Sequence, residues 1–202
     1  MDGFNLYHAL RKQGWQRFYW LNIHALASRF LLPGETLVQT RYYTSRVFGD
    51  AKYARQAAFI NALLTVPEIE IRYGQMRNRP RDCGLCGGEE WVPVEKMTDV
   101  NIASDLLIDS FKARVDTILL LSADSDLTGP LRWIRNEYPH IQIRILFPPG
   151  KDSGDLTQYA HNAQQIGRAR FNQSQFPAEV TQANGIVIRR PVEWAAAPAS
   201  SK

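Results

Sequence analysis

The chain has 202 residues, of which 45% are hydrophobic and 22% charged, which is typical of one globular domain with its own core and a short tail. No apolar run approaches the roughly 20 residues of a membrane span, and Asp2 follows Met1 directly, so no signal-peptide pattern opens the sequence. We therefore expect a cytoplasmic protein with no membrane partner. The formal net charge of +4 is compatible with a polyanionic partner but does not indicate one by itself.

Helical and strand patterns alternate along the chain. In order, we predict a helix over 7–31 that breaks near Gly14, a strand over 36–47, a helix over 50–66, a strand over 68–77, a loop over 78–93, a helix over 98–114, a strand over 115–124, a helix over 125–138, a strand over 141–149, a helix over 153–163 and a short strand over 166–171. This alternation predicts an α/β sandwich around a largely parallel sheet. Residues 193–202 lack periodicity and are predicted to be disordered.

Acidic residues occur where these elements meet. Asp124 and Asp126 come directly after the apolar run Ile118–Leu121, at the carboxyl end of a predicted strand. Asp99 lies at the entry of a helix, and Asp2 precedes the first helical stretch. Because ligands of parallel α/β sheets bind at the carboxyl ends of the strands, we expect these four carboxylates to converge on one cavity.

Four carboxylates in one small site repel one another and raise their pKa values unless a cation is bound. An all-oxygen set of ligands suits Mg²⁺ or Mn²⁺ better than zinc. Such ions activate water and neutralise phosphate charge, so the predicted cluster favours phosphodiester hydrolysis. The simpler alternative is that Asp99, Asp124 and Asp126 only cap the helices that follow them, and that Asp2 is an exposed terminal residue.

Three blocks of sequence resemble the NYN domain family, whose members are PIN-like proteins of the LabA/DUF88 type related to ribonucleases. The blocks are "DGFNLYHAL", "EKMTDVNIASDLLIDSF" and "ILLLSADSDLTGPLRWI", and they stand in the family's order. The resemblance implies a PIN-like three-layer sandwich, placed over 1–172, with a C-terminal extension over 173–202. It also implies a metal-dependent ribonuclease that acts on RNA.

The same resemblance assigns roles to individual residues. Asp2, Asp99, Asp124 and Asp126 become the metal-binding and catalytic acids, with Asn5 and Ser122 as polar supporters. Asp105 matches a second acid of the helix block, but it is six residues from Asp99 and points to another side of the helix, so we rank it lower.

The first block departs from the family pattern, because only Met1 precedes Asp2 where relatives have an apolar central strand. Losing such a strand would leave backbone groups of its neighbours unpaired in a buried sheet. Two interpretations follow: the start has been assigned too late, which we favour, or the chain is truncated and holds Asp2 loosely.

Two cysteines, Cys83 and Cys86, form a C-x-x-C in the predicted loop. We expect a surface loop with reduced thiols; the alternative is a zinc ion, shared between two copies of the chain in a homodimer. The same region carries Arg77, Arg79 and Arg81, which together with Lys96 are predicted to hold an RNA backbone, unless they only solvate the loop. Trp91 is a candidate for base stacking.

Two functions are therefore expected. The first is a Mg²⁺- or Mn²⁺-dependent endoribonuclease. The alternative is a non-nucleolytic member of the family that acts as a regulatory or binding module, or as a component of a catabolic enzyme such as a hydroxylase or monooxygenase. The chain has no G-x-G-x-x-G fingerprint of a dinucleotide site.

Overall fold

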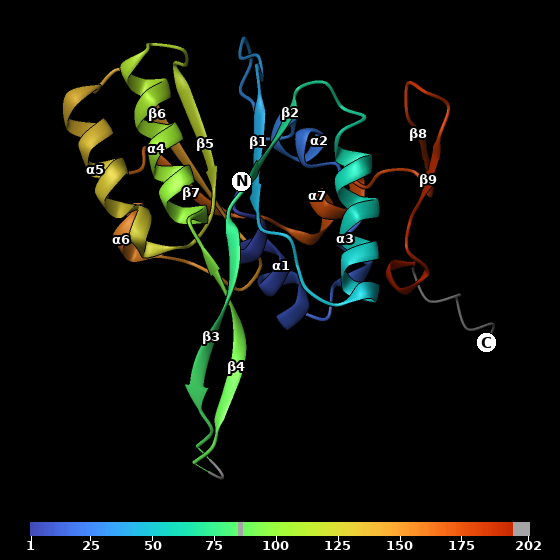
Figure 1. Cartoon of the computed structure of the whole chain (residues 1–202). Coiled ribbons are helices and arrows are strands. Elements are labelled where there is room, and N and C mark those ends of the chain that lie inside the picture. Colours follow the sequence, from blue (N-terminus) through green and yellow to red (C-terminus); the bar gives the residue numbers. More distant parts are fainter. Residues whose placement is uncertain (85–86, 196–202) are drawn as a thin grey trace, which may run out of the picture.

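The computed structural model describes residues 1–84 and 87–195, and Figure 1 shows its arrangement. The strands are β1 (Thr40–Thr44), β2 (Ile69–Tyr73), β3 (Gln75–Asp82), β4 (Glu89–Lys96), β5 (Thr117–Leu121), β6 (Gln142–Phe147), β7 (Asn162–Gln165), β8 (Glu179–Thr181) and β9 (Val187–Arg189). The helices are α1 (Gly3–Lys12), η1 (Gln16–Phe18), α2 (Ile23–Ser28), α3 (Asp50–Leu63), α4 (Thr98–Phe111), η2 (Ser125–Leu127), α5 (Thr128–Glu137), α6 (Gly154–Thr157), α7 (Arg168–Gln173) and η3 (Val192–Trp194). No helix in the described part of the chain is long and apolar enough to cross a membrane.

Two groups of parallel strands form the central layer. β1 pairs with β2, and β5, β6 and β7 pair in that order. Met1 and Asp2 lie between the groups: Asp2 forms a parallel bridge with Tyr43 of β1 and donates its main-chain N–H to the Leu121 carbonyl of β5 (2.9 Å). Two residues thus stand where the family pattern calls for a central strand.

Each face of this layer carries its own hydrophobic core, because successive side chains of a strand point to opposite faces. In β5, Leu121 packs with α1, α2, α3 and α7, whereas Ile118 and Leu120 pack with α4, α5 and α6. In β1, Tyr42 joins the first core and Tyr43 the second. The fold is therefore the predicted α/β three-layer sandwich.

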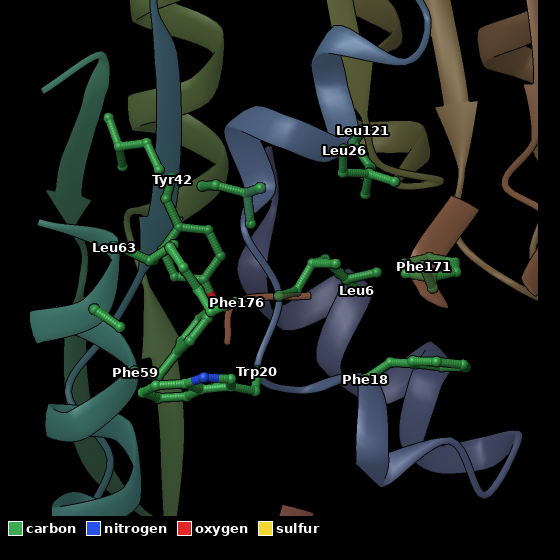
Figure 2. Packing of buried hydrophobic residues seen from close by; sticks show 14 of the residues in the cluster. Leu6, Phe18, Trp20, Leu26, Tyr42, Phe59, Leu63, Leu121, Phe171 and Phe176 are labelled. Carbon is green, nitrogen blue, oxygen red and sulfur yellow. The ribbon is translucent and has the colours of Figure 1, made fainter. Parts of the chain in front are cut away.

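Aromatic rings dominate the first core, part of which is shown in Figure 2. Trp20 is fully buried, contacts Phe59 in a tilted and Phe176 in an edge-to-face arrangement, and donates its Nε1–H to the Pro177 carbonyl (2.7 Å). Because the indole N–H is hydrogen-bonded, burial of this large ring leaves no polar group of Trp20 unpaired.

The prediction of a loop over 78–93 is wrong. β3 and β4 form an antiparallel hairpin that projects from the body of the molecule (Figure 1), with eight residue pairs from Gln75↔Lys96 to Asp82↔Glu89. The many arginines, prolines and glycines of this stretch obscured the alternation of a strand. A hairpin with little buried surface does not need the apolar period on which the prediction relied.

Three further predictions differ from the structure. The strand predicted over 166–171 is wrong, because β7 lies earlier and α7 follows it; the helix predicted over 153–163 ends at Thr157. The large apolar side chain of Trp133 predicts a position in the core, but it is 42% exposed on α5. The break at Gly14 is confirmed, with a φ of +69° that favours glycine.

The end of the described chain returns to the first core. Trp194 of η3 lies 5.5 Å from Tyr19, 6.5 Å from Trp20 and 6.4 Å from Phe59, measured between ring centroids. The disorder predicted over 193–202 therefore does not extend to Trp194, whereas residues 196–202 lie outside the described residues.

We predict that Trp194→Ala lowers the free energy of unfolding by about 1–3 kcal/mol, because a half-buried ring that contacts three aromatic residues is lost. Urea unfolding followed by circular dichroism measures this change. Val192→Ala is the matched control, since Val192 is 84% exposed and should change stability by less than about 0.5 kcal/mol. Equal effects of the two substitutions would contradict the packing role of Trp194.

Candidate metal centre

Asp2 is held rigidly at the carboxyl edge of the sheet and is only 3% exposed. As the N-cap of α1, it accepts a hydrogen bond at Oδ1 from the main-chain N–H of Asn5 (2.9 Å). Its Oδ2 accepts a second bond from Ser122 Oγ (2.9 Å), which lies at the end of β5. These two contacts orient the carboxylate while leaving lone pairs on both oxygens.

Gly3 allows the chain to pass close to β1 directly after Asp2. A Cβ atom at this position would stand 2.6 Å from the Tyr43 carbonyl oxygen and 2.6 Å from the Tyr42 ring. The D-G pair of the first block therefore has a steric reason: any side chain at residue 3 would displace Asp2 from the sheet edge.

The third block reaches the same place from β5. Asp124 caps η2 by accepting the Asp126 N–H at Oδ1 (3.0 Å), and its own N–H donates to Ser122 Oγ (3.1 Å). Asn5 Oδ1 accepts the N–H of Ala123 (3.3 Å). Asn5 and Ser122 thus connect the first block to the third, in the supporting positions predicted for them.

Asp99 enters from the first turn of α4. Met97 precedes this helix with a φ of +76°, and the Glu95 carboxylate accepts hydrogen bonds from the Thr98 N–H (3.2 Å) and from Ser45 Oγ (3.0 Å). Glu95 therefore fixes the start of the helix, and with it the direction in which Asp99 points.

The structure brings three of the four predicted acids together. Asp2, Asp99 and Asp124 each offer one carboxylate oxygen, and these oxygens all lie within 4.8 Å of one another. Asp126 is exposed and lies outside this group, although its charge contributes to the raised pKa of Asp99. Asp105 is engaged elsewhere: it accepts a hydrogen bond from Tyr43 Oη (3.0 Å) and forms an ion pair with Arg72.

The electrostatics of the group call for a cation. Burial, followed by the charges of Asp124 and Asp2, raises the pKa of Asp99 from 3.8 to about 6. Burial also raises the pKa of Asp2, against the opposing hydrogen bonds from Asn5 and Ser122. Three carboxylates at this separation are an all-oxygen donor set, so the residues present fit a hard divalent ion such as Mg²⁺ or Mn²⁺.

A cavity of about 330 Å³ opens onto the three acids, and it contains residues that the sequence did not single out. Lys151, His8 and Glu95 line it together with the acids. Lys151 follows the Pro148–Gly150 turn at the carboxyl end of β6. The rule that located Asp124, ligands at carboxyl strand ends, applies equally to this lysine.

The basic residues of the hairpin share one face. Residues directly opposite in an antiparallel pair lie on the same side, so the register places together Arg77, Arg79, Arg81 and Lys96. Arg81 Nε donates to Glu90 Oε1 (2.9 Å) and Arg77 Nη2 to Gln75 Oε1 (3.0 Å). Trp91 is 65% exposed on the opposite face.

Cys83, the first cysteine of the C-x-x-C, lies at the tip of this hairpin. Cys83 is half-buried, and its N–H donates to the Gly88 carbonyl (2.7 Å) in the turn. Cys86 lies outside the described residues, so zinc binding at Cys83 and Cys86 stays a prediction.

A family model described as the NYN domain matches residues 1–167. The chain belongs to the NYN domain family. The match includes the three acids, the hairpin and all strands of the central sheet, so the resemblance seen in the three sequence blocks is confirmed. NYN domains belong to a PIN-like group of nucleases, which agrees with an acidic group that fits a divalent metal.

Two further proteins are similar to this chain. It is 21% identical over 241 aligned positions to a 6-hydroxy-3-succinoylpyridine 3-monooxygenase of Pseudomonas putida, and the alignment covers 98% of this chain and 75% of that protein. A solved structure from Vibrio parahaemolyticus, of a protein of unknown function, superimposes with a TM-score of 0.54 at 19% identity, covering 82% of this chain and 89% of that one. The similarity to the Vibrio parahaemolyticus structure supports the fold and nothing about function.

The raised pKa of Asp99 predicts a pH dependence of stability without divalent metal. Between about pH 4 and 6 the folded protein binds more protons than the unfolded chain, so its stability falls as the pH rises through this window. Asp99→Asn should flatten this part of the profile. Urea unfolding of both proteins in EDTA, from pH 4.5 to 7.5, measures the difference; parallel profiles would contradict the assignment.

Proposed function

We propose that this NYN protein is a Mg²⁺- or Mn²⁺-dependent endoribonuclease. The observation that carries the proposal is the convergence of Asp2, Asp99 and Asp124 within 4.8 Å, from three separate blocks, at the carboxyl edge of a parallel sheet. These three residues would hold the ion. When bound, it would neutralise phosphate charge and lower the pKa of a water molecule for attack on the phosphodiester.

The protein's own residues position this chemistry. Ser122 and Asn5 hold the Asp2 carboxylate and the backbone that follows β5, so the separation of the acids is set before any ligand arrives. Lys151 lines the same cavity, and we propose that its ammonium group binds a phosphate oxygen of the substrate. Asp126, exposed beside Asp124, is proposed as an additional acid rather than as one of the three principal ligands.

RNA is the proposed substrate because a basic surface adjoins the acidic one. β4 meets the cavity at Glu95, whose side chain lies on the other face of the hairpin from the arginines. The basic face begins at the next residue, Lys96, and continues through the arginines. A row of guanidinium groups at every second residue suits a polyphosphate backbone, which carries charge at regular intervals. Trp91, on the other face, is less suited to stack on bases of the same strand.

The alternative is a non-nucleolytic protein, such as a component of a catabolic enzyme. It is favoured by the name of the Pseudomonas putida relative, a monooxygenase, at 21% identity. The two candidates differ in what the acidic group does: only the nuclease needs the ion for RNA cleavage.

We predict that Asp124→Asn lowers Mn²⁺-dependent RNA cleavage by at least about 100-fold, because one of three charged ligands becomes neutral. Cleavage of labelled single-stranded and structured RNA by purified protein measures this. Glu137→Gln, which changes an exposed acid at the end of α5, is the matched control and should leave the rate unchanged. Equal background cleavage by all three proteins would exclude the nuclease. Calorimetry with Mn²⁺ that also detects no binding would favour the alternative.

A second prediction concerns the hairpin. Arg77→Ala with Arg79→Ala should weaken RNA binding and reduce the slope of log Kd against log salt by about 1 for each lost phosphate contact. Fluorescence anisotropy with catalytically inactive Asp124→Asn protein measures binding without cleavage. Arg132→Ala on α5 removes an exposed arginine outside the hairpin and serves as the control. An unchanged salt slope in the double variant would contradict a role in backbone contact.

A further inference from the structure

An aromatic side chain lies in the wall of the acidic cavity without belonging to a core. Phe4 lines the cavity of about 330 Å³ together with Asp2, Asp99 and Asp124, and it is a member of neither hydrophobic core. Among the described residues that line this cavity, Phe4 alone has a wholly apolar side chain. Packing in the cores therefore does not account for a phenylalanine at this position.

A second ring extends the surface of Phe4. His8 follows one turn later on α1, lines the same cavity and is exposed. The two rings stack with their centroids 6.3 Å apart and their planes at 25°. Tyr7 contacts the His8 ring edge-on, with centroids 5.4 Å apart, and its own ring lies 4.9 Å from that of Tyr19. These contacts hold the His8 ring in place before a ligand binds, which reduces the side-chain entropy lost on binding.

The two rings stand close to the acids because they share a helix with Asp2. Asp2 is the N-cap of α1, so Phe4 lies about 3 Å and His8 about 9 Å further along the helix axis. Lys151 lines the same cavity. A phosphate held at the acids and Lys151 would therefore place the base attached to it beside the Phe4 and His8 rings.

The exposed face of α1 continues from aromatic to basic residues. Arg11 lies seven residues after Phe4, and Lys12 lies four residues after His8, a spacing that keeps them on the same face of the helix. Both are exposed in the last turn of α1. Surfaces that bind single-stranded nucleic acid combine aromatic rings for the bases with cations for the backbone. α1 presents both kinds of side chain in one row that starts at the acids.

We propose that Phe4 and His8 form a nucleobase subsite, on which an unpaired base of the RNA stacks beside the phosphate held at the acids. From this subsite the strand continues along α1 toward Arg11 and Lys12. The subsite deepens the ribonuclease proposed above and rests on it. Because every base has a π-face, stacking selects an accessible base rather than a particular sequence. A base within a duplex is covered on both faces by its neighbours and does not fit this subsite.

The test compares the binding of two chains that carry the same phosphates. One is an RNA of six adenosines, and in the other a stable abasic analogue replaces every nucleoside. Fluorescence anisotropy at constant salt, with Mg²⁺, measures both affinities in Asp124→Asn protein, in which cleavage is suppressed. Phe4→Leu keeps an apolar side chain but removes the ring, and Phe4→Tyr restores a ring. Phe111→Leu is the matched control, since Phe111 is 72% exposed and lies about 18 Å from Asp99 along the axis of α4.

We expect Phe4→Leu to lower the preference for the adenosine chain over the abasic chain by at least about fivefold, which corresponds to one lost stacking contact. Its affinity for the abasic chain should stay within about twofold, because no phosphate contact is removed. Phe4→Tyr and Phe111→Leu should keep the preference of the Asp124→Asn parent. A second readout needs no change at Phe4: the His8 ring-proton NMR signals, assigned with His8→Asn, should shift on addition of the adenosine chain but not of the abasic chain.

The subsite is overturned if Phe4→Leu and Phe111→Leu have equal preferences, if Phe4→Tyr behaves as Phe4→Leu, or if both chains shift the His8 signals equally. Failure of the subsite and failure of the nuclease give different results, because binding is measured without cleavage. RNA cleavage by wild-type protein without a base preference that depends on Phe4 would overturn the subsite alone. A base preference that depends on Phe4, without cleavage by wild-type protein, would overturn the nuclease alone.

Discussion

The organisation of this site depends on the burial of one carboxylate. Asp2 lies at 3% exposure between two strands, and its carboxylate accepts hydrogen bonds from the Asn5 N–H and from Ser122 Oγ, which come from distant parts of the chain. Burial raises the pKa of Asp2, and these two donors oppose that rise. A buried polar group without its hydrogen bonds would be costly, so the same two donors stabilise this corner of the sheet and fix the position of the carboxylate.

The remaining acids reach Asp2 from the starts of two helices. Asp124 caps η2, whereas Asp99 lies in the first turn of α4, whose N-cap residue is Met97. The cap does not compete with metal binding, because it uses one oxygen lone pair of a carboxylate that has about four. Capping fixes the direction of Asp124, and the start of α4, which Glu95 holds, directs Asp99 to the same sheet edge. The capping alternative therefore describes Asp124 but not Asp99.

The hairpin and the acidic group are linked through Glu95. Its carboxylate accepts hydrogen bonds from Ser45 and Thr98, and it thereby connects the last residues of β4 to the first turn of α4. The position of Asp99 in that turn therefore depends on the end of β4, from which the hairpin projects.

Local sequence patterns were sufficient to predict much of the fold and several residues of the candidate site. The apolar run Ile118–Leu121 could only be a buried strand, and the acids that follow it, with Asp2 and Asp99, marked the site, because short-range patterns of charge and hydrophobicity reflect burial directly. Tertiary structure decided the rest. Asp126 and Asp124 stand two residues apart, yet only the geometry of η2 separates the exposed acid from the converging one. Lys151 stands at a strand end, as the rule for parallel sheets allows, but only contacts between residues far apart in the chain place it and Glu95 in one cavity with the acids. The hairpin formed where a loop was predicted, because backbone pairing between β3 and β4 does not require an apolar period.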